Sequence, residues 1–263
     1  MVTVKDIYEE LEKFAPTDRK MDFDNIGLLV GSSENTVEKI MLSLDITDEV
    51  ISEAVLARAN LIISHHPLFF ELKNITDEDV TGRKIIRLIS GGISAICMHT
   101  NLDAAQYGVS DALARAAGVV DAQLLSEDGY DKVGEPYSYG RMGYLAKPIT
   151  LKEYLPVLKN ALGSEGLRYH DAGHPVHKVA MVSGSGGDWL CHAAAHGCDT
   201  FITADVKYDV FLEAKALGIN IIDGDHFCTE NLVIPVLEKL ITESFPDTET
   251  MISKVHGQIA RFA

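Results

Sequence analysis

The stretch that decides the fold runs from Lys39 to Pro67 and reads KIMLSLDITDEVISEAVLARANLIISHHP. Its first seven residues and Leu61–Ser64 are short apolar runs, which predict two strands. Residues 48–59 between them carry apolar side chains at helical spacing, with Thr47 or Asp48 as a suitable N-cap. A strand, a helix and a strand in close succession are typical of a parallel sheet covered by helices.

The same alternation continues on both sides of this stretch. A segment rich in Gly, Asp, Glu, Pro and Tyr at 126–141 interrupts it, and we place a domain boundary there. Strands are predicted at 39–45, 61–64, 93–98, 142–145, 178–182, 200–203, 219–223 and 250–255. Helices are predicted at 4–14, 48–59, 81–90, 110–117, 151–162, 188–196, 206–217 and 230–244. The prediction is an α/β fold of two linked, similar α/β domains, 1–125 and 126–263, with mostly parallel sheets. The final segment is free to pack back on the first domain.

The two halves share a spacing that suggests an internal repeat. Lys39 opens a strand and Asn60 precedes the next one 21 positions later, and Lys178 and Asp199 stand in the same relation. Two unrelated α/β segments can also share this spacing, so a true repeat and a chance likeness both remain open. If the repeat is real, the strand ends of the two halves can face each other across a cleft.

Composition excludes several classes of protein. The 263 residues are 46% hydrophobic, which argues against disorder, and carry a formal net charge of −16, which argues against general affinity for nucleic acid. The opening MVTVKDIYEE does not resemble a signal peptide, and no apolar run reaches the roughly 18 residues of a membrane span. The four cysteines show no C-x-x-C spacing and are expected to be reduced. We therefore expect a cytoplasmic protein without membrane contact.

Imidazoles and carboxylates gather where the predicted strands end, which is where open α/β sheets place their chemistry. This donor set suits two divalent ions and favours Zn, Fe, Mn, Co or Ni over Ca or Mg. The residues after the strands are Asp45, then His65 and His66, then His99 to Asp103, then Thr203 to Asp205, and last Asp223 to His226 with Glu230 four positions later.

Each of these signals has an ordinary alternative. His65 and His66 point to opposite sides if their strand continues, but both can enter one site if the backbone turns at Pro67. His226 and Glu230 lie one helical turn apart, a spacing that is also common on surfaces. Asp103 alone is compatible with a helix cap or a turn. Only the combination favours a metal site.

Other clusters compete with this one. His192 and His196 are four residues apart on a predicted helix but lack the Glu of an H-E-x-x-H motif, so a structural or surface role is expected. His170, His174 and His177 are expected to lie exposed in a loop. Gly184-Ser185-Gly186-Gly187 can present N–H groups to an anion or serve as a packing turn, and both readings stay open. The chain has no G-x-S-x-G motif, which leaves a Ser-His-Asp hydrolase without support.

Several segments, taken in order, resemble the NGG-one-interacting-factor-three-like family, whose members often carry the name GTP cyclohydrolase I type 2 homologue. The likeness covers nearly the whole chain and corresponds to the short form without an inserted domain. The chain departs from many members at three positions: it has Phe227 where they have a second His, Ala204 where they have Gly, and Asp209 where they have His. The segments are Asp24-Asn25-Ile26-Gly27-Leu28, Ser64-His65-His66-Pro67, His99-Thr100-Asn101-Leu102-Asp103, Gly184-Ser185-Gly186-Gly187 and His226-x-x-x-Glu230.

The resemblance implies two α/β domains with a dinuclear metal centre in the cleft between them, and a hexameric ring. It assigns His99 a place beside the metals, as a second-shell or substrate-facing group. It makes His65, His66, Asp103, His226 and Glu230 the metal ligands.

Two functional hypotheses follow. The first is a metal-dependent hydrolase of the GTP cyclohydrolase type, acting on a nucleotide or another phosphorylated small molecule. Two divalent ions would supply a hydroxide and stabilise an oxyanion, and His99 would carry protons. The glycine-rich turn is the only sequence feature that points to a phosphorylated substrate. The alternative is a non-catalytic, ring-shaped protein for metal binding or for protein interaction and regulation.

Overall fold

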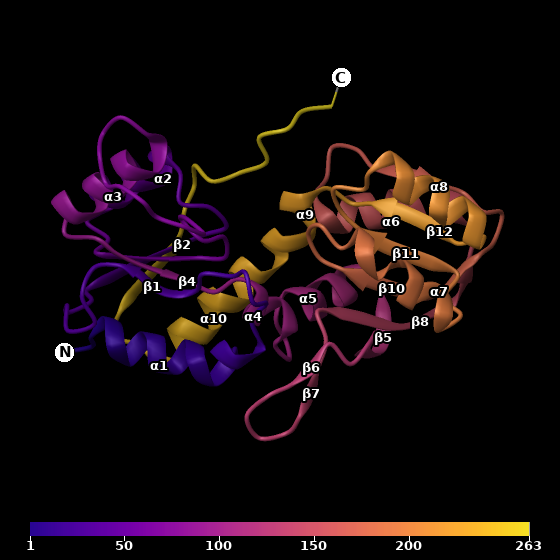
Figure 1. The fold of residues 1–263 in the computed structure, drawn as a ribbon, viewed down its shortest axis with the longest axis horizontal. Helices are drawn as coiled ribbons and strands as arrows, with labels where there is room; N and C mark the ends of the chain where they lie inside the picture. The colour runs from indigo at the N-terminus through magenta and orange to yellow at the C-terminus, as the bar shows by residue number, and fades with distance from the viewer. Residues whose placement is uncertain (263) are drawn as a thin grey trace. The chain divides into compact units, whose positions relative to one another are not determined.

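The computed structural model describes residues Met1–Phe262 as a mixed α/β protein of two compact units (Figure 1). The first unit combines Met1–Ala105 with Ile234–Gly257, and the second comprises Gln106–Val233 with the last described residues from Gln258 onward. Across the described residues, no helix has the length and apolar character needed to cross a membrane.

The first unit is built on a five-stranded sheet in the order β1-β4-β3-β2-β13. Three of its four pairings are parallel, and only β1 runs against its neighbour. The strands are β1 (Gly27–Val30), β2 (Lys39–Ser43), β3 (Leu61–Ser64), β4 (Ser94–Cys97) and β13 (Glu249–Ile252). The helices are α1 (Val4–Phe14), α2 (Asp48–Ala57), α3 (Val80–Ser90), α4 (Thr100–Ala104) and α10 (Ile234–Ser244), with a 3-10 turn η1 (Thr17–Arg19).

Alternation along the strands explains why helices cover both faces of this sheet. Met41, Ile62 and Ala95 pack in one core with buried residues of α2 and α3. In Figure 1, α2 and α3 lie on one side of the sheet and α1 and α10 on the other. Thr47 is the N-cap of α2, since its side chain accepts a hydrogen bond from the Val50 N–H at 3.2 Å.

The second unit holds a six-stranded sheet in the order β5-β8-β10-β11-β12-β9, and a separate hairpin, β6–β7. Its core lies on both faces, with Val179 and Met181 in one cluster and Ala180 and Val182 in the other. The strands are β5 (Val119–Leu124), β6 (Gly129–Tyr130), β7 (Pro136–Tyr137), β8 (Gly140–Ile149), β9 (Arg168–His170), β10 (Val176–Val182), β11 (Thr200–Thr203) and β12 (Asn220–Asp223). The helices are α5 (Val109–Ala116), α6 (Leu151–Leu162), α7 (Leu190–Ala195), α8 (Tyr208–Leu217) and α9 (His226–Glu230), with 3-10 turns η2 (Gly187–Trp189) and η3 (Asn231–Val233).

The prediction of mostly parallel sheets is correct for the first unit and wrong for the second. Only two of the five pairings in the second sheet are parallel, those of β11 with β10 and with β12. β8 runs antiparallel to both β5 and β10, and β9 runs antiparallel to β12. The chain passes from β5 to β8 through a hairpin and without a crossover helix, so these two strands must oppose each other.

The chain divides at 105/106 and again at 233/234, which differs from the predicted boundary at 125/126. β5 pairs with β8, and Leu113 and Val119 lie in the core of the second unit. The stretch 126–141 that suggested a boundary forms the hairpin inside that unit. The closing segment packs on the first unit, where β13 pairs with β2.

Asn60 and Asp199, the residues that mark the 21-residue spacing, perform the same local task. The side chain of Asn60 accepts hydrogen bonds from the backbone N–H groups of Glu38 and Lys39, at 3.0 and 3.3 Å. The carboxylate of Asp199 accepts one from the Lys178 N–H at 2.7 Å. Each side chain comes just before one parallel strand and binds the backbone of the neighbouring strand, which supports the interpretation as a repeat.

Candidate metal centre

In the first unit, β2, β3 and β4 end at one edge of the sheet, and polar side chains follow each of them. The backbone turns after β3, where the His66 N–H donates to the Leu44 carbonyl at 2.9 Å and the Ser64 hydroxyl donates to the His66 carbonyl at 2.8 Å. The ring nitrogens offered by His65, His66 and His99 lie within 4.8 Å of one another. The turn therefore directs the adjacent pair to one place, where β4 also delivers His99.

Each of these three imidazoles has its Nδ1 atom held by an acceptor. His65 Nδ1 lies 2.9 Å from the Met98 carbonyl oxygen, His66 Nδ1 lies 2.7 Å from Asp45, and His99 Nδ1 lies 2.8 Å from Asp24. A carbonyl oxygen and an ionised carboxylate only accept, so the proton of a neutral ring stays on Nδ1 and the lone pair on Nε2. Metal-ligating histidines are oriented in this way.

Asp24 is the more buried of the two carboxylate acceptors. Burial alone would raise the pKa of its carboxyl group, but hydrogen bonds from His99 and Thr100 outweigh burial and lower that pKa to about 2. The carboxylate is therefore ionised at neutral pH and holds the His99 ring through its Nδ1 atom. Asp103, in the short helix α4, places its Oδ1 atom 3.9 Å from His65 Nε2.

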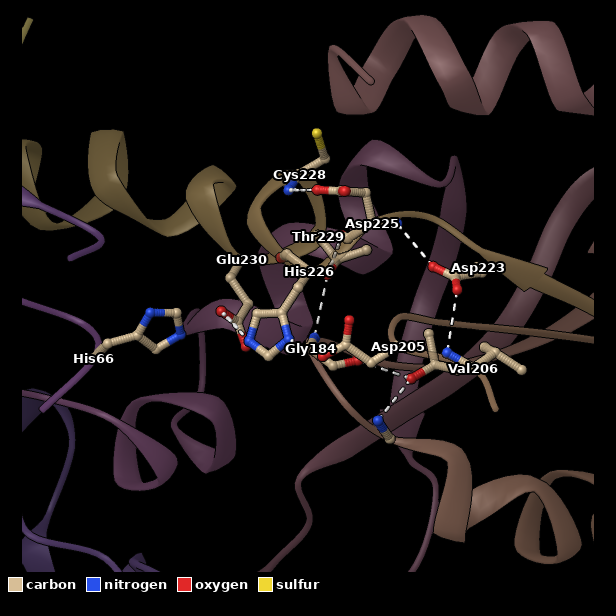
Figure 2. A network of polar contacts seen from close by, with 12 residues as sticks. His66, Gly184, Asp205, Val206, Asp223, Asp225, His226, Cys228, Thr229 and Glu230 are labelled. Carbon is tan, nitrogen blue, oxygen red and sulfur yellow. Dashed lines mark hydrogen bonds and ion pairs between the residues drawn. The ribbon is translucent and has the colours of Figure 1, made fainter. Parts of the chain in front are cut away.

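In the second unit, α9 begins at His226 and ends at Glu230 (Figure 2). His226 Nε2 lies 3.1 Å from Glu230, and His226 Nδ1 lies 2.7 Å from Asp205. Burial would lower the pKa of His226, but the hydrogen bonds and negative charges of Glu230 and Asp205 raise it to about 9. Two carboxylates around one imidazole favour positive charge at this point of the unit.

Gly184 shapes the space in which these two side chains lie. It has φ +57°, and a Cβ atom there would come within 2.1 Å of Glu230 Oε1 and 3.2 Å of His226 Nε2. The Gly184 N–H donates to Thr229 Oγ1 at 3.1 Å, and the Gly186 N–H donates to Thr203 Oγ1 at 2.9 Å. These bonds favour a packing turn over a phosphate-binding one.

Two non-glycine residues beside His226 adopt left-handed backbone conformations, Asp205 with φ +52° and Asp225 with φ +75°. Such conformations cost on the order of 1–3 kcal/mol and persist where surrounding structure fixes them. Asp205 holds the His226 ring, and Asp225 caps α9 by accepting from the Cys228 N–H at 3.1 Å. The strain is thus located at the two residues that position His226.

The histidines of the competing clusters lie elsewhere. His192 and His196 are exposed on or just after α7, as expected for a surface role. His170 lies in β9 and His177 in β10, so the predicted loop is wrong for these two, and His174 lies exposed between the strands. Phe227 packs against the core of the second unit, Ala204 is buried and Asp209 is exposed.

Sequence reasoning missed the acceptors behind the imidazoles. The sequence places Asp45 and Asp205 at strand ends and Asp24 in the motif at 24–28, but it does not reveal that these carboxylates contact the imidazoles. A carboxylate 21 positions before a strand-end His is the shared signal, since it relates Asp45 to His66 and Asp205 to His226.

An α/β chain that ends its strands in oriented imidazoles and carboxylates has the donor set of a transition-metal protein. The model of the Duf34/NIF3 family (NGG1p interacting factor 3) matches residues 2–258, and the chain belongs to this family.

Relatives and solved structures agree with this assignment. A protein of Clostridium perfringens named GTP cyclohydrolase 1 type 2 homolog is 37% identical over 254 residues, covering 95% of this chain and 96% of its own. A protein of Clostridium acetobutylicum with the same name is also 37% identical, covering 90% of this chain and 88% of its own. The structure of a Bacillus cereus protein related to NIF3 matches with a TM-score of 0.93 at 24% identity, covers 100% of this chain and 99% of its own, and shows likeness of fold alone. Reduced HcgD from Methanocaldococcus jannaschii matches with a TM-score of 0.82 at 25% identity, covering 96% of this chain and 98% of its own.

We expect Asp205→Asn to weaken metal binding about 10- to 100-fold, the range typical for loss of a carboxylate behind a ligating imidazole. Asn tolerates the left-handed backbone at this position, so the fold should be retained. Affinity can be measured by competition with a chromogenic chelator. Asp209→Asn, an exposed carboxylate on α8, is the matched control. Equal affinities of the two variants would contradict a role for Asp205 in orienting His226.

Proposed function

We propose that the chain binds two divalent metal ions and is a metal-dependent hydrolase. The ligands would be His65, His66 and Asp103 of the first unit and His226 and Glu230 of the second. The carrying observation is that acceptors engage the Nδ1 atoms of His65, His66 and His226, which orients each ring. The Nε2 atoms of His65 and His226 then lie toward carboxylates, 3.9 Å from Asp103 and 3.1 Å from Glu230. Imidazole and carboxylate donors fit Zn, Fe, Mn, Co or Ni. When bound, such ions polarise a substrate and lower the pKa of water.

His99 is the residue we assign to proton transfer. Its Nδ1–H donates a hydrogen bond to Asp24. Its Nε2 atom can therefore accept a proton from the attacking water and return it to the leaving group. The ionised Asp24 stabilises the imidazolium that forms, as the Asp of a Ser-His-Asp triad does. Asp24 therefore acts through His99 and holds it in the tautomer that accepts.

The substrate class we propose is a nucleotide or another phosphorylated small molecule. Support comes from the relatives named GTP cyclohydrolase 1 type 2 homolog. The glycine-rich turn adds none, because its Gly184 and Gly186 N–H groups are bonded within the unit. We also propose a hexamer, which light scattering on the purified protein tests directly.

The hydrolase proposal is tested with protein expressed in metal-replete medium, with metal quantified and with nucleotides and phosphoesters screened. We expect about two metal ions per chain, and we expect His66→Ala to lose both metal and turnover. His192→Ala, an exposed His of α7, should change neither. Metal content near zero in wild type would overturn the ligand assignment. Two ions per chain without turnover of any substrate would leave the non-catalytic metal-binding alternative.

A further inference from the structure

Two exposed phenylalanines lie beside His99 in the first unit. Phe23 and Phe70 are 63% and 52% exposed, and their ring centroids are 5.9 Å apart. The Phe70 ring centroid is 6.0 Å from that of His99, with the planes tilted by 58°. The aromatic surface thus continues from solvent to the imidazole that we assign to proton transfer.

The two segments that carry these rings are held to each other and to the site. The Asn25 side chain donates to the Phe69 carbonyl at 2.8 Å, which ties the segment after Phe23 to the residue before Phe70. The Met21 N–H donates to Thr100 Oγ1 at 3.0 Å, which ties the same segment to the start of α4. The backbone segments that carry the rings are therefore held to each other, which limits the ordering cost when a ligand stacks on them.

The chemistry of this surface selects a neutral, planar group as the part of a ligand that contacts the rings. The charged residues next to the rings in sequence are all acidic: Asp22 and Glu71 are exposed, and Asp24 is buried. Acidic neighbours disfavour an anion, whereas the faces and edges of phenyl rings attract flat aromatic rings in offset or tilted stacks. Every nucleobase has such a face, and stacking on aromatic side chains is the usual way in which proteins hold one.

We propose that Phe23 and Phe70 form a stacking platform for the heteroaromatic ring of the substrate, with a nucleobase as the class of ring. This inference rests on the proposed function and specifies which part of the substrate the chain recognises. Stacking on the platform places the nucleobase next to His99. His99 can then transfer protons to or from the base or the bond adjoining it.

The test compares ligands with and without a ring, using metal-loaded protein and isothermal titration calorimetry. We expect guanosine to bind wild type and to bind Phe70→Leu and the double variant F23L/F70L about tenfold or more weakly, within the range that base stacking spans. Ribose 5-phosphate should bind all three proteins alike. Leu keeps the apolar character, so the variants isolate the aromatic face. Tyr208→Leu, which removes a 78% exposed ring from the second unit, is the matched control.

Each result bears on the platform separately from the hydrolase. If wild type and F23L/F70L bind guanosine equally, or if neither binds it, the platform is wrong even where metal content and turnover agree with the hydrolase. If guanosine binding depends on the rings while no substrate is turned over, the platform stands and the hydrolase fails. If F23L/F70L only changes the molar mass measured by light scattering, the rings are a contact between copies and the proposal is overturned.

Discussion

Gly184→Ala is expected to remove metal binding by the second unit and to destabilise the fold by about 1–3 kcal/mol. Gly184 has φ +57°, where a side chain is strained, and the added Cβ atom would stand 2.1 Å from Glu230 Oε1. The carboxylate cannot keep its place beside His226 with that atom present. One methyl group thus acts on both the backbone and a proposed ligand.

The same turn supplies the control for this substitution. At Gly187 the nearest atom to an added Cβ is a Val210 methyl at 3.4 Å, an ordinary contact. Gly187→Ala should therefore keep the metal content and thermal midpoint of wild type. Gly184→Ala should bind less metal and unfold at a lower temperature. If the two variants have the same metal content and thermal midpoint, Gly184 is not needed to leave space for the Glu230 carboxylate.

Asp24→Asn is expected to destabilise the protein by about 3 kcal/mol at pH 7, because it disrupts the hydrogen bonds that a buried carboxylate accepts. The Asp24 carboxylate accepts from His99 Nδ1 and the Asn25 N–H on one oxygen, and from the Thr100 N–H and hydroxyl on the other. Asn offers only one oxygen, so its NH₂ group must face donors of the other pair.

The loss should depend on pH in a defined direction. The pKa of Asp24 is lowered from 3.8 to about 2 in the folded protein, so its carboxylate stabilises the fold fully above pH 3.8. That stabilisation disappears as the pH falls from 3.8 toward 2, because the unfolded chain then binds the proton first. Urea midpoints of wild type and Asp24→Asn should therefore converge over this window. Asp22→Asn, at an exposed neighbour, should show no such convergence, and a constant gap for Asp24→Asn would contradict the assignment.

Strong periodicity made the central elements predictable. The boundaries of α1, β3, α6 and β11 are as predicted. The two helices repeat apolar residues at helical spacing, and the two strands are short, continuously buried runs. The strands that the sequence does not predict lie at sheet edges. An edge strand pairs with a single neighbour and is less buried, so its apolar pattern is weaker. β5 is largely exposed along its length, and β9 is a three-residue strand that pairs only with β12. The helix predicted at 230–244 contains the last residue of α9, then η3 and α10.

Some features of the site follow from nearby sequence, and others depend on contacts between residues far apart in the chain. The strand-end positions of His65, His99 and His226 follow from the alternation of elements, and the sequence places them correctly. The Asp24 contact with His99 joins residues 75 positions apart, so no local pattern contains it. The role of Gly184 depends on where Glu230 points, which only the packed second unit defines.

The return of Ile234–Gly257 to the first unit sets the order in which the chain can mature on the ribosome. The segment Gln106–Val233 leaves the ribosome without interruption, so the second unit can form its sheet early. β2 must wait with one edge unpaired until β13 emerges, and an unpaired edge is a site for mistaken strand pairing. The half of the chain that is made first is therefore the half that is finished last.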